Sequence, residues 1–441
     1  MKDPVFKRLL LVLLLTVAAG CEVTAEKIEL WKGTQNGPQK LSAALVDPGL
    51  AVDLRAKAAL ALVEINAWDI FRESFQKMEK ADAEKVVDAV APILAKMVES
   101  APAGADKISK LQMDAKDALF MLLDYASAGG RAAVEKPLID WCTTDYNTRA
   151  MAGQFKINIM VKKIGARAGE ALVPLLTLDQ LAIQYIADLI VELKDDGVAQ
   201  KASAQIAKVL KASVGKIQEI HLVAAATIGG NPVADALIGF ATDPKLDAAL
   251  QRFALRALSQ AVDKKRVQLD DARMARLLAL AENPDTDKFQ REETFYLVAQ
   301  AGRPADVPRI MRLLADKDSF FRAVALRCLL RTDPETHLEP ALAEIARLGL
   351  TTSAEDVNEV ISRVDSFPKL LPKARGLVES KNPFVRAVAV YVLGDIGQAS
   401  DKAILEKLAA DKTRLPKGFE DATIGAAAKK GIEKISMKRG V

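Results

Sequence analysis

A recurring spacing of apolar and polar positions is clearest between Pro304 and Thr332. Apolar residues recur there at intervals of three and four, which places side chains on one face of an α-helix. The recurrence stops at a polar turn, Asp316 to Ser319, and then resumes. The stretch therefore predicts two short amphipathic helices, and so tight a turn makes them antiparallel. The apolar positions are Val307, Ile310, Leu313 and Leu314 before the turn, and Phe321, Val324, Ala325, Leu326 and Leu329 after it.

Copies of this helix pair occur along most of the chain. One pair alone buries too little apolar surface to stay folded, so the copies must stack on one another. The predicted second helices centre near residues 58, 118, 150, 186, 225, 254, 295, 325, 360, 389 and 427, mostly 29 to 40 apart. That period predicts an all-α fold, a right-handed superhelical α-solenoid of about eleven antiparallel helix pairs. The clearest turn markers are Asp47-Pro48, Asp243-Pro244, Asn283-Pro284 and Asn382-Pro383, because Asp or Asn caps a helix start and Pro is tolerated there.

Two departures from the period carry further predictions. The widest gap, between 58 and 118, contains two apolar stretches, 65–78 and 83–98, so we expect an additional helix there. Glycine also recurs just after second helices, where a left-handed residue ends a helix at little cost. These glycines are Gly229, Gly230, Gly302, Gly394 and Gly397.

The composition agrees with packed helices and indicates no strong attraction to nucleic acid. Half of the 441 residues are apolar but only 5% are aromatic, which fits close-packed helices better than a β-sandwich. Lys and Arg number 62 against 58 Asp and Glu, a net charge of +4. So small an excess gives no pull toward nucleic acid, and we expect most charges to lie on solvated helix faces.

The first 21 residues follow the pattern of an export signal. Lys2, Lys7 and Arg8 precede an apolar run from Leu9 to Ala19, and small residues lead directly to a cysteine. Ala18-Ala19-Gly20-Cys21 resembles the lipobox of bacterial lipoproteins. The resemblance implies cleavage after Gly20 and a diacylglycerol on the Cys21 thiol, with no other cofactor. An uncleaved membrane anchor and an ordinary signal peptide are the alternatives, although this run falls short of the roughly 20 residues that span a bilayer.

The two other cysteines are expected to be unpaired thiols. Cys142 and Cys328 lie 186 residues apart, a distance of several repeats in a linear array. A disulfide needs Cα atoms within about 7 Å, which such an array does not provide. We expect Cys328 in the core and Cys142 beside Trp141 near a turn. Trp31, Trp68 and Trp141 all lie in the first third of the chain. Core packing is the expected role of these residues, and binding at an exposed one is the alternative.

Two turns carry a recognisable motif. Asp316-Lys-Asp-Ser-Phe-Phe-Arg322 and Asn382-Pro-Phe-Val-Arg386 are similar to HEAT repeats of the armadillo-like class, and the resemblance covers residues 38 to 436. It implies that the turn residue and the following Arg link neighbouring repeats, a role assigned to Asp316 with Arg322 and to Asn382 with Arg386. The role is not assigned to the second helix 247–260, where the matching position is Ala249.

These patterns divide the chain into four predicted parts. Residues 1–20 form the lipoprotein signal peptide, and 21–37 form a lipidated tether and N-terminal cap. Residues 38–436 form the repeat solenoid, and 437–441 form a short basic tail.

Catalytic and metal-binding motifs are absent from the sequence. Its two histidines, His221 and His337, lie 116 residues apart, and neither has the partner spacing of a zinc site. No nucleophile elbow, phosphate loop or dinucleotide fingerprint occurs. We therefore interpret the chain as a protein that is not an enzyme and binds no metal.

One uneven charge distribution indicates a candidate binding surface. Residues 245–331 hold 17 Lys or Arg against 12 Asp or Glu. Some of these cations would lie along the concave side of a solenoid and form a weakly basic groove. Ordinary solvated helix faces are the alternative. The groove residues would be Arg252, Arg256, Arg322 and Arg327.

These patterns favour a non-catalytic adaptor that is lipid-anchored in a bacterial cell envelope and holds unidentified envelope proteins. Glu22 follows the predicted lipidated cysteine, and by resemblance to lipoproteins the lack of Asp there favours the outer membrane, facing the periplasm. Two alternatives remain open: a lipoprotein that binds a polyanion or an envelope polymer, and an enzyme resembling the HEAT-like lyases.

Overall fold

The computed structural model describes residues 22–102, 104, 107–144, 146–151, 156–301, 303–318, 321–322, 325, 328–329, 335–339, 342, 369–415 and 419–437, with the side chains of 150, 151, 299 and 304 excluded. The described part is built of α-helices and short 3₁₀ turns, and contains no strand beyond an isolated bridge between Arg414 and Thr423. The predictions for Gly20, Cys21, Arg327, the second helix near 360 and the tail after 437 lie outside these residues. Within the described residues, no helix combines the length and hydropathy that a membrane span needs.

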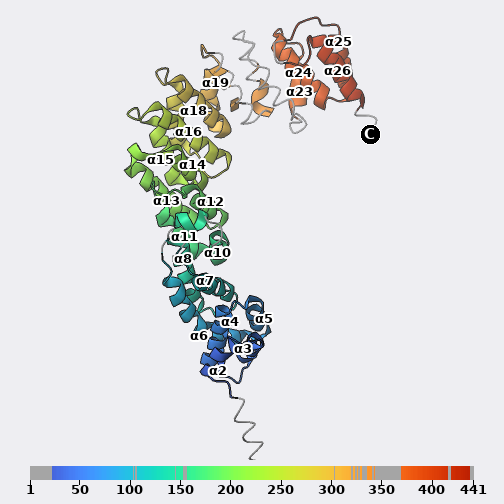
Figure 1. Ribbon diagram of the computed structural model, residues 1–441. Helices are drawn as coiled ribbons and strands as arrows, with labels where there is room; N and C mark the ends of the chain where they lie inside the picture. The colour runs from blue at the N-terminus through green and yellow to red at the C-terminus, as the bar shows by residue number, and fades with distance from the viewer. Residues whose placement is uncertain are drawn as a thin grey trace, which may run out of the picture. The chain divides into compact units, whose positions relative to one another are not determined.

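The contacts divide the chain into two compact units, which meet between Gln205 and Ile206 inside helix α13 (Asp196–Ala212). Figure 1 labels the helices of both units. The helices of the N-terminal unit are α2 Ala25–Trp31, α3 Gly37–Val46, α4 Val52–Glu64, α5 Trp68–Lys77, α6 Lys80–Glu99, α7 Lys110–Leu122, α8 Arg131–Thr143, α9 Tyr146–Met151, α10 Ile157–Ile164, α11 Ala166–Leu172 and α12 Ile183–Glu192. Those of the C-terminal unit are α14 Glu219–Ile228, α15 Asn231–Thr242, α16 Ala248–Asp263, α17 Asp271–Glu282, α18 Lys288–Ala301, α19 Val307–Leu313, α23 Leu370–Leu377, α24 Pro383–Ile396, α25 Lys402–Leu408 and α26 Ile424–Met437.

Successive helices pack as pairs, and the pairs stack as HEAT-like repeats. In the N-terminal unit α3 packs on α4 and α6 on α7, and in the C-terminal unit α15 packs on α16, α17 on α18 and α23 on α24. The second helices α14, α16 and α18 also contact one another in a row, while α15 contacts α17 in the neighbouring row. The prediction of an all-α fold of stacked helix pairs is confirmed.

The predicted turn markers lie between paired helices, but among the four Asn382 alone caps a second helix, α24, through the Phe384 amide at 2.9 Å. Asp243 instead accepts from the Lys245 amide inside its turn, and Asp247 caps α16 by accepting hydrogen bonds from the Ala249 and Leu250 amides. The additional helix expected between 58 and 118 is α5, which lies against α3 and α4 and precedes the α6–α7 pair.

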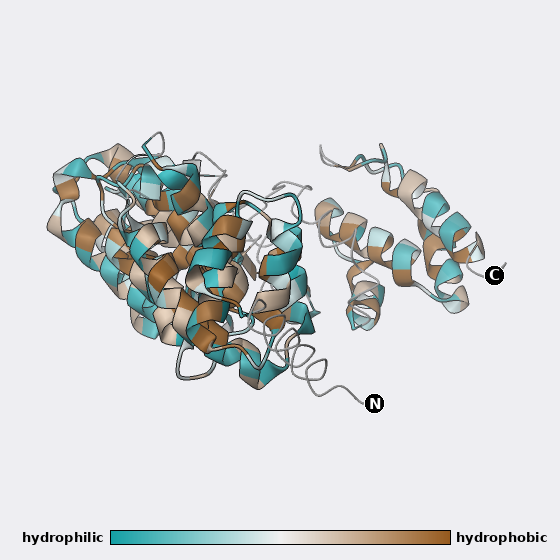
Figure 2. Cartoon of the chain, turned by 60° about the horizontal axis from the view of Figure 1, so that its bottom comes forward, coloured by the Kyte–Doolittle hydropathy of each residue, from teal (hydrophilic) through white to brown (hydrophobic). Residues whose placement is uncertain are grey.

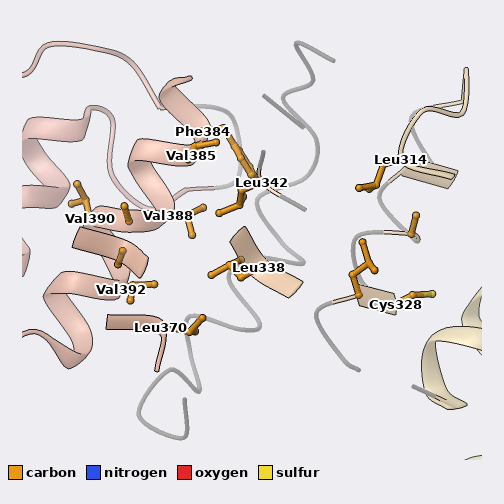
Figure 3. Close-up of a cluster of buried hydrophobic side chains, with 14 of the residues drawn as sticks. Leu314, Cys328, Leu338, Leu342, Leu370, Phe384, Val385, Val388, Val390 and Val392 are labelled. Carbon is orange, nitrogen blue, oxygen red and sulfur yellow. The ribbon is translucent and has the colours of Figure 1, made fainter. Parts of the chain in front are cut away.

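The cores are continuous from one pair to the next. Apolar and polar residues alternate along each helix in Figure 2, so every helix has an apolar side. In the C-terminal unit these sides join into one cluster that runs from Met274 to Ile435, and Figure 3 shows Val385 and Val388 of α24 in this cluster with Leu338 and Leu342. A single helix pair could not form such a core, because the apolar surface is buried only when neighbouring pairs stack.

Two glycine predictions have different outcomes. Gly229 ends α14 at a φ of 74°, as expected for a helix end. Gly394 does not end a helix: it lies inside α24, and a Cβ there would come within 2.8 Å of the Gly431 Cα on α26. Gly394 is therefore a site of close helix approach. Gly397 does end α24, but at a φ of −64° rather than in the left-handed region, and Gly302 lies outside the described residues.

Many charges lie on exposed helix faces, as expected, and several of these also bridge successive repeats. On the second helices, the Lys163 ammonium lies 2.6 Å from Asp124, and that of Lys162 lies 2.7 Å from Glu192. On the first helices, Lys201 pairs with Glu170 at 2.6 Å. The nearly balanced composition thus has a structural use, because cations of one repeat pair with carboxylates of the next.

Candidate functional site

The residues predicted for a basic groove lie in the C-terminal unit, on the row formed by α16 and α18. We call the surface made by Arg252, Arg256, Phe289 and Glu293 the α16–α18 face. The Phe289 side chain is 58% exposed, and the Arg252 guanidinium lies over its ring at 5.7 Å from the centroid. An exposed aromatic ring beside a cation is typical of binding hot spots.

One of the two cations of this face, Arg256, is paired with a carboxylate. The Arg256 Nε donates to a Glu293 carboxylate oxygen at 2.8 Å, and this bond, reinforced by the charges of Glu293, Glu219 and Glu292, raises the pKa of Arg256. Arg322 is engaged elsewhere, because it donates to the carbonyls of Asp316 and Lys317 at 2.7 and 2.8 Å. The described part of the predicted groove is thus an aromatic and charge-paired surface rather than a strongly basic one.

Of the four residues predicted to join repeats, Asp316 and Arg386 do so, with partners that differ from the predicted ones. Asp316 accepts from Arg291 of the preceding repeat at 3.3 Å, while Arg322 holds the carbonyls of its own turn. Arg386 reaches forward to Asp411 and Thr413, and Asn382 serves as a helix cap and not as the partner of Arg386.

The residue that joins one repeat to the next is the fourth residue of the second helix. The sequence analysis did not align the repeats at this position. Arg55 of α4, Arg291 of α18 and Arg386 of α24 all hold it. In α16 the equivalent residue is Gln251, not Ala249, since α16 begins at Ala248. Gln251 reaches only the Asp243 carbonyl of its own turn, at 2.5 Å.

A second candidate surface lies in the N-terminal unit, where α5, α7 and α10 surround a depression of about 390 Å³ that we call the Trp68 pocket. Trp68, Phe71, Arg72 and Phe75 share one face of α5: Phe71 and Phe75 are buried, while Trp68 and Arg72 line the pocket beside them. The ring of Phe75 lies 5.3 Å from that of Tyr125, just after α7, and this contact holds α5 against α7. The lining residues are Trp68, Arg72, Asp117, Phe120, Met121, Asp124, Lys156 and Lys163.

The charges at the Trp68 pocket are only partly matched. Lys163 pairs with Asp124 at 2.6 Å and lies 4.8 Å from the Phe120 ring centroid. Asp117 holds Lys116 at 2.8 Å and Lys156 at 3.6 Å. Arg72 lies 4.0 Å from Asp69, the outer limit of an ion pair, and its side chain is 58% exposed. Arg72 is therefore the most loosely held cation of the lining.

Sequence reasoning found one residue of this pocket and missed the others. A tryptophan outside the core was the available signal, and Trp68 is the one that fits it best. Trp141 is 2% exposed and lies 4.4 Å from the Arg149 guanidinium, so its role is packing. Arg72, Phe120 and Lys163 carry no motif, and only the packing of α5 brings them near Trp68.

The described residues show no catalytic constellation. His221 is buried and accepts a hydrogen bond from the Gln218 amide at 2.9 Å, which places it in the start of α14. Cys142 and Cys328 form no disulfide with each other, and Cys328 lies in the core, as predicted. Cys142 is buried as well, and burial raises the pKa of its thiol to about 12, so it is not a reactive thiolate. No group of three or more His, Cys, Asp or Glu in the described ranges is placed to hold a metal ion.

Comparison with known proteins adds structures but no family. No family model and no curated protein matches the chain. An engineered protein known from a crystal structure aligns over 93% of this chain and 98% of its own, with 16% identity and a TM-score of 0.25. Kap95 in complex with Nup1 aligns over 94% of this chain and 68% of its own, with 13% identity and a TM-score of 0.29. Kap121p bound to Nup53p aligns over 93% of this chain and 51% of its own, with 11% identity and a TM-score of 0.27. Superpositions this loose transfer no function to this chain.

Proposed function

We propose that this chain is a non-catalytic adaptor, anchored by lipid at Cys21 in a bacterial cell envelope, that binds partner proteins along its row of second helices. The observation that supports binding is the exposed Phe289 ring beside Arg252 on the α16–α18 face. Aromatic residues and arginine are the residue types enriched in the buried centre of protein interfaces. Paired charges such as Arg256 with Glu293 would surround that ring as a polar rim.

The structure favours this role over the alternative of a polyanion-binding lipoprotein. Polyanion binding depends on cations that are free to replace counterions, and its affinity falls steeply with salt. On the α16–α18 face Arg256 is already neutralised by Glu293. A protein partner that buries Phe289 needs no large excess of positive charge.

A photo-crosslinking amino acid placed at Phe289 in the native envelope tests partner binding. The matched control places it at Ala279, an exposed position on α17 in the neighbouring row. We expect discrete protein adducts from position 289 and few from 279, with the captured proteins identified by mass spectrometry. Equal labelling from both positions, or none from either, would refute partner binding on this face.

The anchor is tested separately, because only the sequence supports it. Mass spectrometry of the mature protein should find Cys21 as the N-terminal residue, with acyl chains attached to it. Cys21→Ala should release the chain from the membrane fraction. A mature protein that begins elsewhere, or one that stays membrane-bound without Cys21, contradicts the lipid anchor but leaves the adaptor role open.

A further inference from the structure

The Trp68 pocket combines an apolar floor with a cation that lacks a close partner. Trp68, Phe120 and Met121 supply the apolar lining, and five of the eight lining residues are charged. The indole nitrogen of Trp68 donates to the Asn66 side chain at 2.5 Å, so its polar edge is satisfied. Its ring also lies edge-on to Phe71, at 6.0 Å between centroids, which fixes its orientation. A preorganised aromatic side chain of this kind binds apolar groups at low entropic cost.

The charges around the pocket favour an anionic occupant. Three cations, Arg72, Lys156 and Lys163, face two carboxylates, Asp117 and Asp124. Each carboxylate already holds a lysine, Asp117 also holds Lys116, and the Asp69 carboxylate is 4.0 Å from Arg72. An incoming carboxylate could therefore bind Arg72 in a bidentate manner without breaking an existing close pair.

The size and openness of the pocket decide between an extended peptide and other anions. A volume of about 390 Å³ admits a few side chains and not the surface of a folded domain. An acyl chain prefers an enclosed apolar channel, whereas most of this lining is charged. An extended segment can place one apolar side chain on Trp68 and Phe120 and a neighbouring carboxylate on Arg72.

We propose that the Trp68 pocket binds a short acidic segment of a partner protein, in which an Asp or Glu lies next to a large apolar residue. This inference rests on the proposed adaptor function and names the chemistry of one partner segment. It differs from the α16–α18 face, which lies in the other unit and has its own test.

The test is fluorescence anisotropy of the full chain with short labelled peptides in which Glu alternates with Leu or Phe. Peptides with Lys in place of Glu, and a fluorescent fatty acid, are the competing ligands. We expect binding of the acidic peptides to weaken about tenfold or more in Arg72→Glu and in Trp68→Ala, the loss expected at an interface hot spot. Raising the salt concentration should weaken the same complex.

A matched pair of control variants lies outside both the Trp68 pocket and the α16–α18 face. Arg276→Glu and Tyr185→Ala remove an exposed cation and an exposed aromatic ring at these other positions, and should leave peptide affinity unchanged. Arg72 is exposed, so its variant remains informative if Trp68→Ala destabilises α5. Equal losses in the control variants, equal binding of the Lys peptides, or tighter binding of the fatty acid would each overturn the proposal. Crosslinking at Phe289 would still report on the adaptor function.

Discussion

The repeat formed by α3 and α4 and the repeat formed by α15 and α16 are joined to their neighbours in different ways. Arg55, at the fourth position of α4, is 1% exposed, donates to the Leu45 carbonyl at 2.8 Å and reaches Asp82 of the next repeat at 2.7 Å. Gln251 holds the same position in α16 but contacts only its own turn. In the α3–α4 repeat, Arg55 thus both holds its own turn and forms an ion pair with the next repeat. In the α15–α16 repeat, Gln251 holds its own turn but does not reach the next repeat.

Other contacts replace the missing arginine link around α16. The Gly230 amide donates to the Arg266 carbonyl at 2.9 Å, and Gln290 donates to the Ala241 carbonyl at 2.6 Å. Arg273 pairs with Asp235 at 2.8 Å across the neighbouring row. Stacking therefore does not depend on one motif, because any polar contact that crosses the repeat boundary can take its place.

The largest expected effect comes from breaking a replacement contact. Gly229→Ala would place a Cβ 2.5 Å from the Arg266 Cβ and 2.6 Å from its carbonyl oxygen, at a φ of 74°. We expect a loss of about 3 kcal/mol in the stability of α14 to α17, from backbone strain and steric overlap together. Hydrogen exchange of the amides in these helices measures the loss.

The control for this variant is Gly239→Ala in α15, where a Cβ would meet nothing within 4 Å. This variant should leave hydrogen exchange unchanged or slow it, because Ala in place of Gly stabilises a helix by up to about 1 kcal/mol. If the two alanines behave alike, the junction at Gly229 does not carry the stacking of this repeat.

The second variant breaks the arginine link itself. Arg55→Gln keeps a donor for the Leu45 carbonyl but loses the ion pair with Asp82, so it imitates Gln251. Because Asp82 is partly exposed and can regain water, we expect a loss of about 2 kcal/mol, below that of a fully buried pair. Faster hydrogen exchange in α4 and α6 would show the loss, and unchanged exchange there would mean that the two repeats are joined alike.

The sequence predicted what depends on local pattern. The turns at Asp243-Pro244 and Asn382-Pro383, the extra helix between 58 and 118, and the lack of a disulfide between Cys142 and Cys328 all follow from spacing and residue type. The cap of α16 does not, because Asp247 and not Asp243 provides it. The sequence located the repeat-joining position in α24 but not in α16. Without the first residue of α16, either Ala249 or Gln251 could be aligned with the joining arginines. Gly394 was misplaced because a glycine that ends a helix and one that admits another helix look the same in sequence.

The Trp68 pocket was beyond sequence reasoning for a different reason. Trp68 and Lys163 lie 95 residues apart, and no repeat period relates them. They meet because α5, the helix outside the repeat pattern, packs against α3 and α4 near the end of α7. A site made by an irregular element cannot be found from the regular ones.

Lowering the pH should destabilise the repeat joined by Arg55 and Asp82 more than the repeat in which Gln251 holds the same position. The Arg55 guanidinium donates a hydrogen bond to Asp82 and lowers the pKa of that carboxyl, as Arg375 lowers the pKa of Asp401. A carboxyl whose pKa is lowered by folding stabilises the fold above its unfolded pKa, about 4, and this contribution is lost as the pH falls through the folded value. Between pH 5 and the acid limit, exchange in α4 and α6 should therefore accelerate more than in α16, where Gln251 contacts a carbonyl and not a carboxylate. Helix α15 is not a reference for this comparison, because Arg273 lowers the pKa of its Asp235.

Arg55→Gln again provides the control. It should remove the steeper part of the acid response in α4 and α6 while leaving that of the Asp401 region intact. An acid response that is the same with and without Arg55 would assign the effect to other carboxylates.

The smallest expected effect tests whether exposed pairs join repeats at all. Arg256 and Glu293 link α16 to α18 at 2.8 Å, but the arginine side chain is 59% exposed. Solvent screens such a pair, so Arg256→Ala should cost less than about 1 kcal/mol and lose most of that effect in high salt. Phe295 and Leu255, both fully buried on the same two helices, would then account for the stacking there. A larger loss of stability that persists in high salt would instead show that the Arg256–Glu293 pair replaces the arginine link that is missing at Gln251. The main role of the α16–α18 face would then be to join repeats rather than to bind a partner.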